Sequence, residues 1–305
     1  MALQLVSRAS DWPADSAQGI RRSGHDFMSM SFVRALILVP WRCLRQLHRH
    51  AYVLRLLAAQ DLRARLHGSV LSHAWLLLTP LLMLAVYVLV FGEILQVRWP
   101  GRHVDSGAVL GANIFAGLVL LGFFSDVVSR APQLVVSRPN FVKRLAFPLY
   151  LLPVVSVGTA LMVLLPALLV LVGFIAATMQ TFSVTLMALP LVVLPVALLA
   201  CGAAWFLSAV GVYMRDVHQV VAPILAALTF LSPVFFPLQA VPPRWRDWLM
   251  LNPLAVPVEQ MRRICVEGLW PQWNDLAWAN VGGLLACWIG LAWFEATREG
   301  FADAL

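Results

Sequence analysis

The stretch "LSPVFFP", Leu231 to Pro237, interrupts an apolar run that extends from Val217 to Val241. The run is long enough to cross a membrane, which takes about 20 mostly apolar residues. Proline, however, removes a backbone N–H and ends or kinks a helix. A bilayer tolerates such a break only where the backbone is buried in protein or lines a cavity. The sequence therefore predicts a membrane helix that bends and ends early, as a gate requires.

The composition places the chain among integral membrane proteins. Of its 305 residues, 61% are hydrophobic and 12% are charged, and the mean hydropathy is +0.81. This is more apolar side chain than one soluble core buries. We expect an all-α integral membrane protein with six transmembrane helices and both termini on one side, the spans being residues 72–95, 108–128, 147–176, 186–213, 217–241 and 277–294.

The basic residues predict the orientation, because short cytoplasmic loops retain Lys and Arg. With the N-terminus inside, 16 of the 22 basic residues are cytoplasmic, and the other six lie outside: Arg98, Arg102, Arg244, Arg246, Arg262 and Arg263. The net charge of +7 then reflects topology and contact with anionic lipid headgroups. No soluble portion is large enough for a nucleic-acid-binding domain, so we expect no nucleic-acid partner.

The N-terminal region differs from the rest. We expect residues 1–43 to form a cytoplasmic tail and predict no cleavable signal in them, because their apolar run is short and is interrupted by Arg34. Residues 44–67 have an apolar helical face with arginines on the other sides. This pattern predicts an interfacial helix lying on the membrane; the alternative is a surface helix of a small soluble domain. Residues 299–305 are expected to be cytoplasmic.

Several kinds of site are not found in the sequence. The four cysteines and seven histidines make no metal-binding spacing, so we expect no metal site. A polyprenyl transferase or proton-coupled carrier would want buried carboxylates, and only Glu93 and Asp126 approach the membrane interior. Lys143 is the only lysine and follows no glycine-rich turn, which excludes a P-loop. We expect a transport protein and no enzyme; any ATP and Mg²⁺ belong to a partner.

Two cytoplasmic features stand out. Residues 126–145, between the second and third predicted spans, combine Arg138, Asn140, Lys143 and Arg144, and are followed by Phe147 and Pro148. Pro148 suits the start of a helix. The loop either retains positive charge for topology alone or docks a partner. Arg215 and Asp216 form a charged pair in a tight turn between two spans, where we expect one charge to neutralise the other.

Residues 242–272 are too polar to cross a membrane and too apolar for a free loop. We expect two short helices that split at Asn252 and Pro253 and dip into the outer membrane face as a gate. An aromatic anchor that only fixes depth is the alternative. The predicted gate residues are Ser232, Pro233, Pro237, Trp245, Trp248, Asn252, Pro253 and Arg262.

Aromatic and small residues suggest further contacts within the membrane. Large aromatic side chains within the spans either anchor the helices at the membrane interface or line a channel, and the channel-lining candidates are Trp75, Tyr87, Phe91, Trp205 and Tyr213. Small residues spaced by four favour close helix packing. They occur at Gly107 with Gly111, and at Gly282 with Ala286 and Gly290.

Two segments carry a family resemblance. "RPNFVKRLAFPLYLLP" (138–153) and the run from "VGVYMRDV" (210–217) to "LNPLAVPVEQMRR" (251–263) resemble the membrane subunit of ABC type 2 exporters. The resemblance is strongest to O-antigen polysaccharide permeases, with teichoic-acid and capsule permeases as relatives. It covers residues 44–298 and leaves the N-terminal tail unexplained.

This resemblance implies a homodimer on two copies of a separate ATPase subunit in the bacterial inner membrane, with a channel for a lipid-linked polysaccharide. Residues 44–67 would be the interface helix, 126–145 the coupling helix and 242–272 the periplasmic gate. Arg138, Asn140, Lys143, Arg144, Phe147 and Pro148 would couple to the ATPase. The alternatives are export of capsule or teichoic-acid polymer, export of a small drug or lipid, and a membrane polyprenyl transferase.

Overall fold

The computed structural model describes residues 51–66, 72–95, 107–138, 148–179 and 183–304. Every regular element in these ranges is helical. In chain order they are α2 (Ala51–Leu66), α3 (Ser72–Tyr87), the π-helix η1 (Val88–Ile94), α4 (Gly107–Arg130), the 3-10 turn η2 (Ala131–Gln133), α6 (Leu151–Met179), η3 (Val184–Ala188), α7 (Leu189–Tyr213), α8 (Val217–Leu231), η4 (Leu238–Ala240), α9 (Pro243–Met250), α10 (Ala255–Cys265), α11 (Trp273–Thr297), η5 (Arg298–Gly300) and α12 (Phe301–Ala304).

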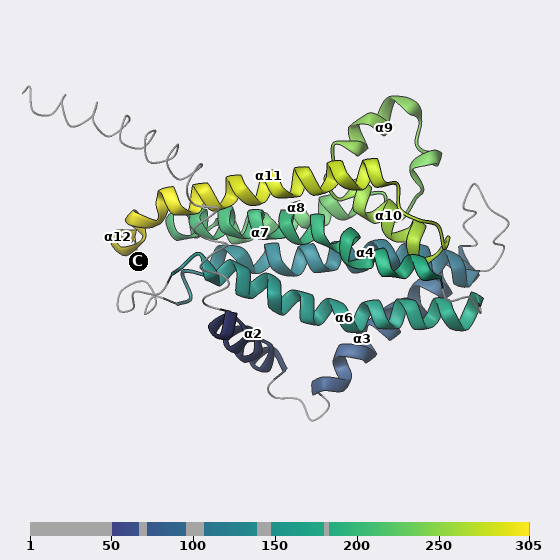
Figure 1. The fold of residues 1–305 in the computed structure, drawn as a ribbon, viewed down its shortest axis with the longest axis horizontal. Helices are drawn as coiled ribbons and strands as arrows, with labels where there is room; N and C mark the ends of the chain where they lie inside the picture. The colour runs from purple at the N-terminus through teal and green to yellow at the C-terminus, as the bar shows by residue number, and fades with distance from the viewer. Residues whose placement is uncertain (1–50, 67–71, 96–106, 139–147, 180–182, 305) are drawn as a thin grey trace, which may run out of the picture.

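The long helices form one bundle (Figure 1), and α4 lies inside it, in contact with α3, α6, α7, α8 and α10. Helices α7 and α11 lie side by side and run in the same direction. At one end the hydroxyl of Thr185 donates to the carbonyl of Ile264 (2.9 Å). At the other end the hydroxyl of Tyr213 donates to the carbonyl of Thr297 (2.8 Å). We refer to the first as the α9 end and to the second as the α12 end.

Five helical segments are long and apolar enough to cross a membrane: Ala74–Ile94, Gly107–Gln133, Leu151–Thr178, Val184–Tyr213 and Trp273–Gly300. The predicted span at 217–241 needs correction, because its helix α8 ends at Leu231. Ser232 turns to an extended conformation, and Pro233 cannot continue the helix. With 15 residues, α8 is about 22 Å long, which is shorter than the roughly 30 Å hydrocarbon layer.

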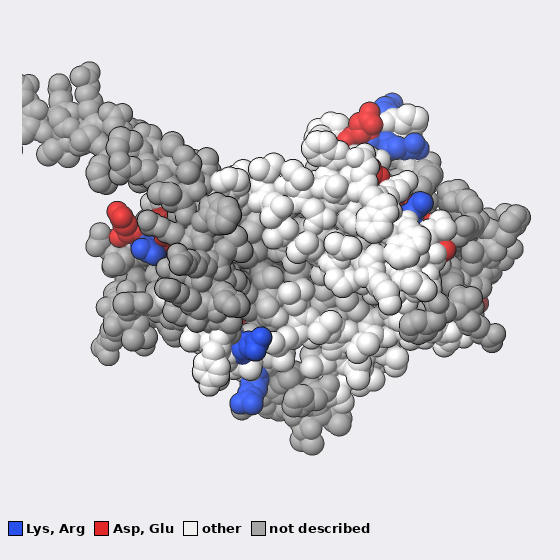
Figure 2. All heavy atoms as spheres, in the orientation of Figure 1, with Lys and Arg blue, Asp and Glu red and all other residues white. Residues whose placement is uncertain are grey.

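The visible face of the bundle is uncharged over its middle, and the charged side chains gather towards its margins (Figure 2). One group lies on α9, and a second lies beside the α12 end, where α2 also carries arginines (Figures 1 and 2). A wide uncharged belt between charged regions is what a bilayer-spanning protein requires, since lipid tails offer charges no partner.

Close contacts between α7 and α11 depend on small residues. A Cβ atom on Gly202 would collide with the carbonyl of Ala286, and one on Gly290 would collide with the carbonyl of Gly202. This confirms the predicted packing role of Ala286 and Gly290. The prediction was wrong for Gly282, because a Cβ there would meet no atom within 4 Å. Space remains beside Gly282 because it borders a cavity.

The other predicted small pair, Gly107 and Gly111, packs against the first span. A Cβ on Gly107 would collide with the backbone of Gly92, and one on Gly111 would collide with Val88. These contacts hold the π-helix η1 against the start of α4, so the two spans approach closely at the α9 end.

Candidate functional site

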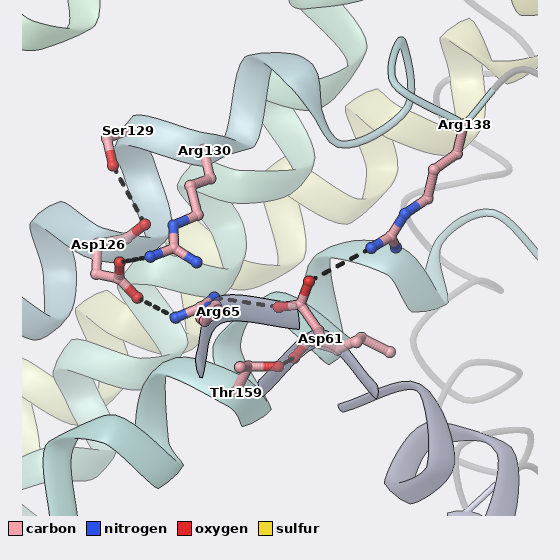
Figure 3. A network of polar contacts seen from close by, with 8 residues as sticks. Asp61, Arg65, Asp126, Ser129, Arg130, Arg138 and Thr159 are labelled. Carbon is pink, nitrogen blue, oxygen red and sulfur yellow. Dashed lines mark hydrogen bonds and ion pairs between the residues drawn. The ribbon is translucent and has the colours of Figure 1, made fainter. Parts of the chain in front are cut away.

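A cluster of five acidic and basic side chains joins helix α2 to the α12 end of the bundle (Figure 3). Arg65 on α2 donates from Nη1 to Oδ2 of Asp126 on α4 at 2.9 Å, and Arg130 donates to the other oxygen of Asp126. Asp61 on α2 accepts from Arg65 at 3.2 Å and from Arg138 at 3.5 Å. Each carboxylate therefore bridges two guanidinium groups. We call these five residues the ion cluster.

The ion cluster forms because both helices present charges at helical spacing. Asp61 and Arg65, and likewise Asp126 and Arg130, are four residues apart, and such pairs lie on one helix face. The side chain of Arg65 is 16% exposed and that of Asp126 is 26% exposed, so water screens their contact less than it screens a surface pair. Displacement of the segment that carries Arg138 would therefore strain the contacts that join it to α2 and, through Arg65, to α4.

The coupling residues predicted from the sequence fall partly within the described chain. Arg138 joins the ion cluster, and Pro148 lies half-buried just before α6. Asn140, Lys143, Arg144 and Phe147 lie outside the described residues. Sequence reasoning missed Asp61 and Arg65, although an aspartate within an otherwise basic helix face was a signal that an arginine partner was near.

The turn between α7 and α8 contradicts the predicted neutralisation of Arg215 by Asp216. Both side chains are exposed, and no ion pair joins them in the described structure. Consecutive residues do not face each other on a helical turn. The main-chain carbonyl of Asp216 accepts the N–H of Gln219 at 2.9 Å, and its side chain caps no N–H of α8. The α12 end therefore displays two separate charges here.

The break after α8 is held by residues that the sequence predicted as a gate. The side-chain amide of Asn252 donates to the hydroxyl of Ser232 at 2.8 Å, and its carbonyl oxygen accepts the N–H of Leu254 at 3.0 Å. Ser232, Pro233 and Pro237 are buried. Pro253 is exposed. The breaks after α8 and between α9 and α10 are thus tied to each other.

Arg262 completes this junction from α10. Its guanidinium donates from Nε to the carbonyl of Asn113 at 3.1 Å and from Nη2 to the carbonyl of Val234. Glu259 lies 3.5 Å from Nη1. The residue is only 3% exposed, and burial lowers its pKa to about 10, so it remains charged at neutral pH. We call Ser232, Val234, Asn252 and Arg262 the gate junction.

The two predicted gate tryptophans are not part of the gate junction. Trp245 and Trp248 lie on α9, which projects from the bundle (Figure 1). Trp248 is 70% exposed, and the guanidinium of Arg244 lies 5.7 Å from the ring centre of Trp245. Exposed tryptophans beside arginines on a short helix are typical of a membrane interface.

Two of the predicted channel aromatics belong to a row at the α9 end. Tyr87 lies 6.4 Å from Phe91, whose ring stacks on Phe235 at 5.8 Å, and Phe235 stacks on Phe230 at 5.9 Å. The row connects the first span to the break after α8. We call these four residues the aromatic row. Phe230 and Phe235 were not predicted, although Phe235 lies within "LSPVFFP".

The other three predicted channel aromatics lie apart from the aromatic row. Trp75 is half exposed on α3, and Tyr213 packs against Phe301 at the α12 end. The prediction was wrong for Trp205, which is 3% exposed. Its indole N–H donates to the carbonyl of Tyr150 at 2.9 Å. Buried indoles find such partners, so Trp205 connects α7 to the start of α6 and cannot line an open channel.

No group of three or more His, Cys, Asp or Glu within the described ranges is arranged to hold a metal ion. The described ranges contain two hydrogen-bonded junctions at opposite ends of a helical bundle, together with a row of aromatic rings.

Sequence comparison relates the chain to known transport proteins. A family profile described as "ABC-2 type transporter" matches residues 52–266. The chain is similar to an O-antigen export system permease protein RfbA of Myxococcus xanthus, with 28% identity over 87% of this chain and 99% of the relative. A protein of the same name from Klebsiella pneumoniae is 20% identical over 81% of this chain and 92% of its own. The polysialic acid transport protein KpsM of Escherichia coli is 24% identical over 79% and 91%.

Proposed function

This chain belongs to the ABC-2 type transporter family, and from that premise we propose that it is the membrane permease of a polysaccharide export system. The observation that carries the proposal is the match over 99% of the length of a permease named for O-antigen export. The named cargo of two further relatives, O-antigen and polysialic acid, is also polysaccharide. We propose a lipid-linked polysaccharide of the O-antigen type as the substrate, with capsule polymer as the alternative that KpsM supports.

The energy is proposed to come from a separate ATPase subunit, in two copies, which holds ATP and Mg²⁺. The ion cluster supports docking at the α12 end, because it links Arg138 to α2 and α4. A movement imposed on residues 126–145 would pass through these charge-assisted bonds, which are stronger than neutral hydrogen bonds, to the amphipathic helix and the second span.

We propose a homodimer with the channel between the protomers. Two helices have faces that the bundle leaves uncovered: only 6% of the first span is buried, and α8 exposes Ile224 and Phe230. In this arrangement α8 is a short sixth crossing, and its missing length is made up by residues 232–242. The aromatic row would border the exit, where its rings offer the weak contacts on which a moving sugar chain can slide.

The gate junction is the proposed hinge of the exit. Arg262 binds the backbone of both α4 and the segment after α8, so opening must break or carry along these bonds. The α12 end would face the cytoplasm of a bacterium, and the α9 end the periplasm. The positive-inside rule supports this orientation, with both termini cytoplasmic and the bundle in the inner membrane.

A deletion strain tests the proposal. We expect long glycan to accumulate on its cytoplasmic lipid carrier and to be absent from the surface, and the wild-type chain to restore surface glycan. The Lys143→Glu and Arg144→Glu double variant should insert at wild-type level without restoring export. The Arg98→Glu and Arg102→Glu double variant changes the net charge equally on the opposite side of the predicted topology, and it is the matched charge control. Normal surface glycan in the deletion strain would contradict polysaccharide export and favour a small amphipathic cargo.

A further inference from the structure

A cavity of about 590 Å³ opens at the α9 end of the protein, between α9 and α10 on one side and α7 and α11 on the other. Its volume lies within the range of small-molecule pockets, roughly 300–1,000 Å³. It shares Asn252 with the gate junction, but no residue of the ion cluster or the aromatic row lines it. It is therefore a feature that the export mechanism above leaves unused.

The inner part of the cavity is apolar and deep. Leu199 of α7 and Gly283 of α11 lie on its wall, and each is ten residues beyond the first residue of its helix. At 1.5 Å per residue this is about 15 Å, which is half of a hydrocarbon layer about 30 Å thick. A sugar at this depth would lose the hydrogen bonds that its hydroxyl groups make with water, whereas a hydrocarbon chain has no such bonds to lose.

One position on the cavity wall has no side chain to fill the space beside it. Gly282 lines the cavity, and a Cβ atom built there meets nothing within 4 Å. The neighbouring Gly283 is different, because a Cβ on it would collide with the carbonyl of Pro195. The space beside Gly282 is thus a cavity and not a helix contact, and a large side chain at this position would fill it.

The rim of the cavity is charged with both signs. Its guanidinium groups are those of Arg246 and Arg263, and its carboxylates are those of Glu259, Glu267 and Asp275. Guanidinium groups recognise phosphate through paired N–H donors, and carboxylates attract an ammonium group. Glu259 already lies beside Arg262 at 3.5 Å. A purely anionic headgroup would still meet the carboxylates of Glu267 and Asp275, so the rim is complementary to a headgroup that carries a phosphate and an ammonium together.

We propose that this cavity binds a zwitterionic phospholipid of the leaflet at the α9 end. One acyl chain would lie along Leu199, Gly282 and Gly283, and the headgroup would lie between the arginines and carboxylates of the rim. Trp278, which lines the cavity and is 70% exposed, lies between these levels, as aromatic residues do at membrane interfaces. The bound lipid would brace α9 and α10 against α11. This proposal does not depend on the identity of the exported cargo.

Photo-crosslinking in nanodiscs tests the proposal. The full chain is reconstituted in a mixture of zwitterionic and anionic phospholipids with a trace of phosphatidylethanolamine that carries a diazirine in its acyl chain. We expect adducts on the cavity wall of α7 and α11. Gly282→Trp should reduce them about tenfold, the effect of losing 1.4 kcal/mol of binding energy. Gly173→Trp on α6 is the matched control, because that glycine also faces open space.

The headgroup is tested by a second comparison. A phosphatidylglycerol probe with the same diazirine should label the cavity wall less than the zwitterionic probe does. Arg263→Gln should weaken both probes, whereas Asp275→Asn should reduce only the preference for the ammonium headgroup. The proposal is overturned if Gly282→Trp leaves the adducts unchanged or if both probes label the cavity wall equally. It is also overturned if a polyprenyl diphosphate at trace concentration competes with the probe, because the cavity would then bind the carrier lipid of the cargo.

Discussion

Replacing Arg262 by leucine should destabilise the protein more than any other single arginine change at the α9 end. The variant would leave the carbonyl of Val234 buried without the donor that Arg262 supplies, and the carbonyl of Asn113 would lose its bond at 3.1 Å. An unsatisfied buried carbonyl costs about 1–3 kcal/mol and a lost hydrogen bond about 1 kcal/mol. We therefore expect a loss of about 2–4 kcal/mol in the free energy of unfolding.

Thermal unfolding of the purified chain, followed by the fluorescence of its 12 tryptophans, measures this loss. A change of this size lowers the midpoint by about 3–6 °C, because the unfolding entropy of a globular chain is about 2.1 cal/mol/K per residue. Arg262→Lys should fall between the leucine variant and the wild type, because an ammonium group cannot reach carbonyls in two directions. Arg244→Leu on the projecting helix α9 is the control and should stay within about 0.5 kcal/mol of wild type. Equal midpoints for the leucine variants would refute the assigned role of the gate junction.

Three further changes test other parts of the structure. The variants Asp126→Asn and Arg65→Gln, alone and combined, should show an interaction energy of about 0.5–3 kcal/mol in a double-mutant cycle of thermal unfolding; simple additivity would mean that the ion cluster is not a unit. Gly202→Val should cost about 1–3 kcal/mol, because its side chain collides with the carbonyl of Ala286, and an unchanged midpoint would contradict the close helix contact. Phe235→Ala should lower surface glycan without lowering the amount of inserted protein, and full export would remove the aromatic row from the path.

Most of the membrane helices could be predicted from the sequence, because the bilayer fixes the length of an apolar span. Apolar runs of that length located five of the helices that the structure presents as spans. The same rule failed at residues 217–241, where hydropathy alone counts a full span and Pro233 ends the helix. The prolines themselves carried the correct signal, because a proline acts on the backbone locally and needs no knowledge of its neighbours.

Contacts across long sequence separations were harder to predict. Asn252 and Arg262 were predicted to be gate residues, because Asn252 was expected to split two short helices and Arg262 to lie in the second of them. Their contacts with Ser232 and Val234 became clear only in the fold. Asp126 is 61 residues from Arg65, and no periodicity connects them. Trp205 was misassigned for the same reason, since composition shows an aromatic ring but not which helix it faces.

The most direct test of the central claim is transport by purified components. Proteoliposomes that contain this chain and its ATPase subunit receive a lipid-linked polysaccharide on the ATPase side, and a glycosidase on the opposite side reports its arrival. We expect glycan cleavage that requires ATP and that is lost in the Lys143→Glu and Arg144→Glu double variant. Cleavage without ATP, or ATP-driven movement of a small amphipathic lipid but of no glycan, would contradict polysaccharide export by this chain.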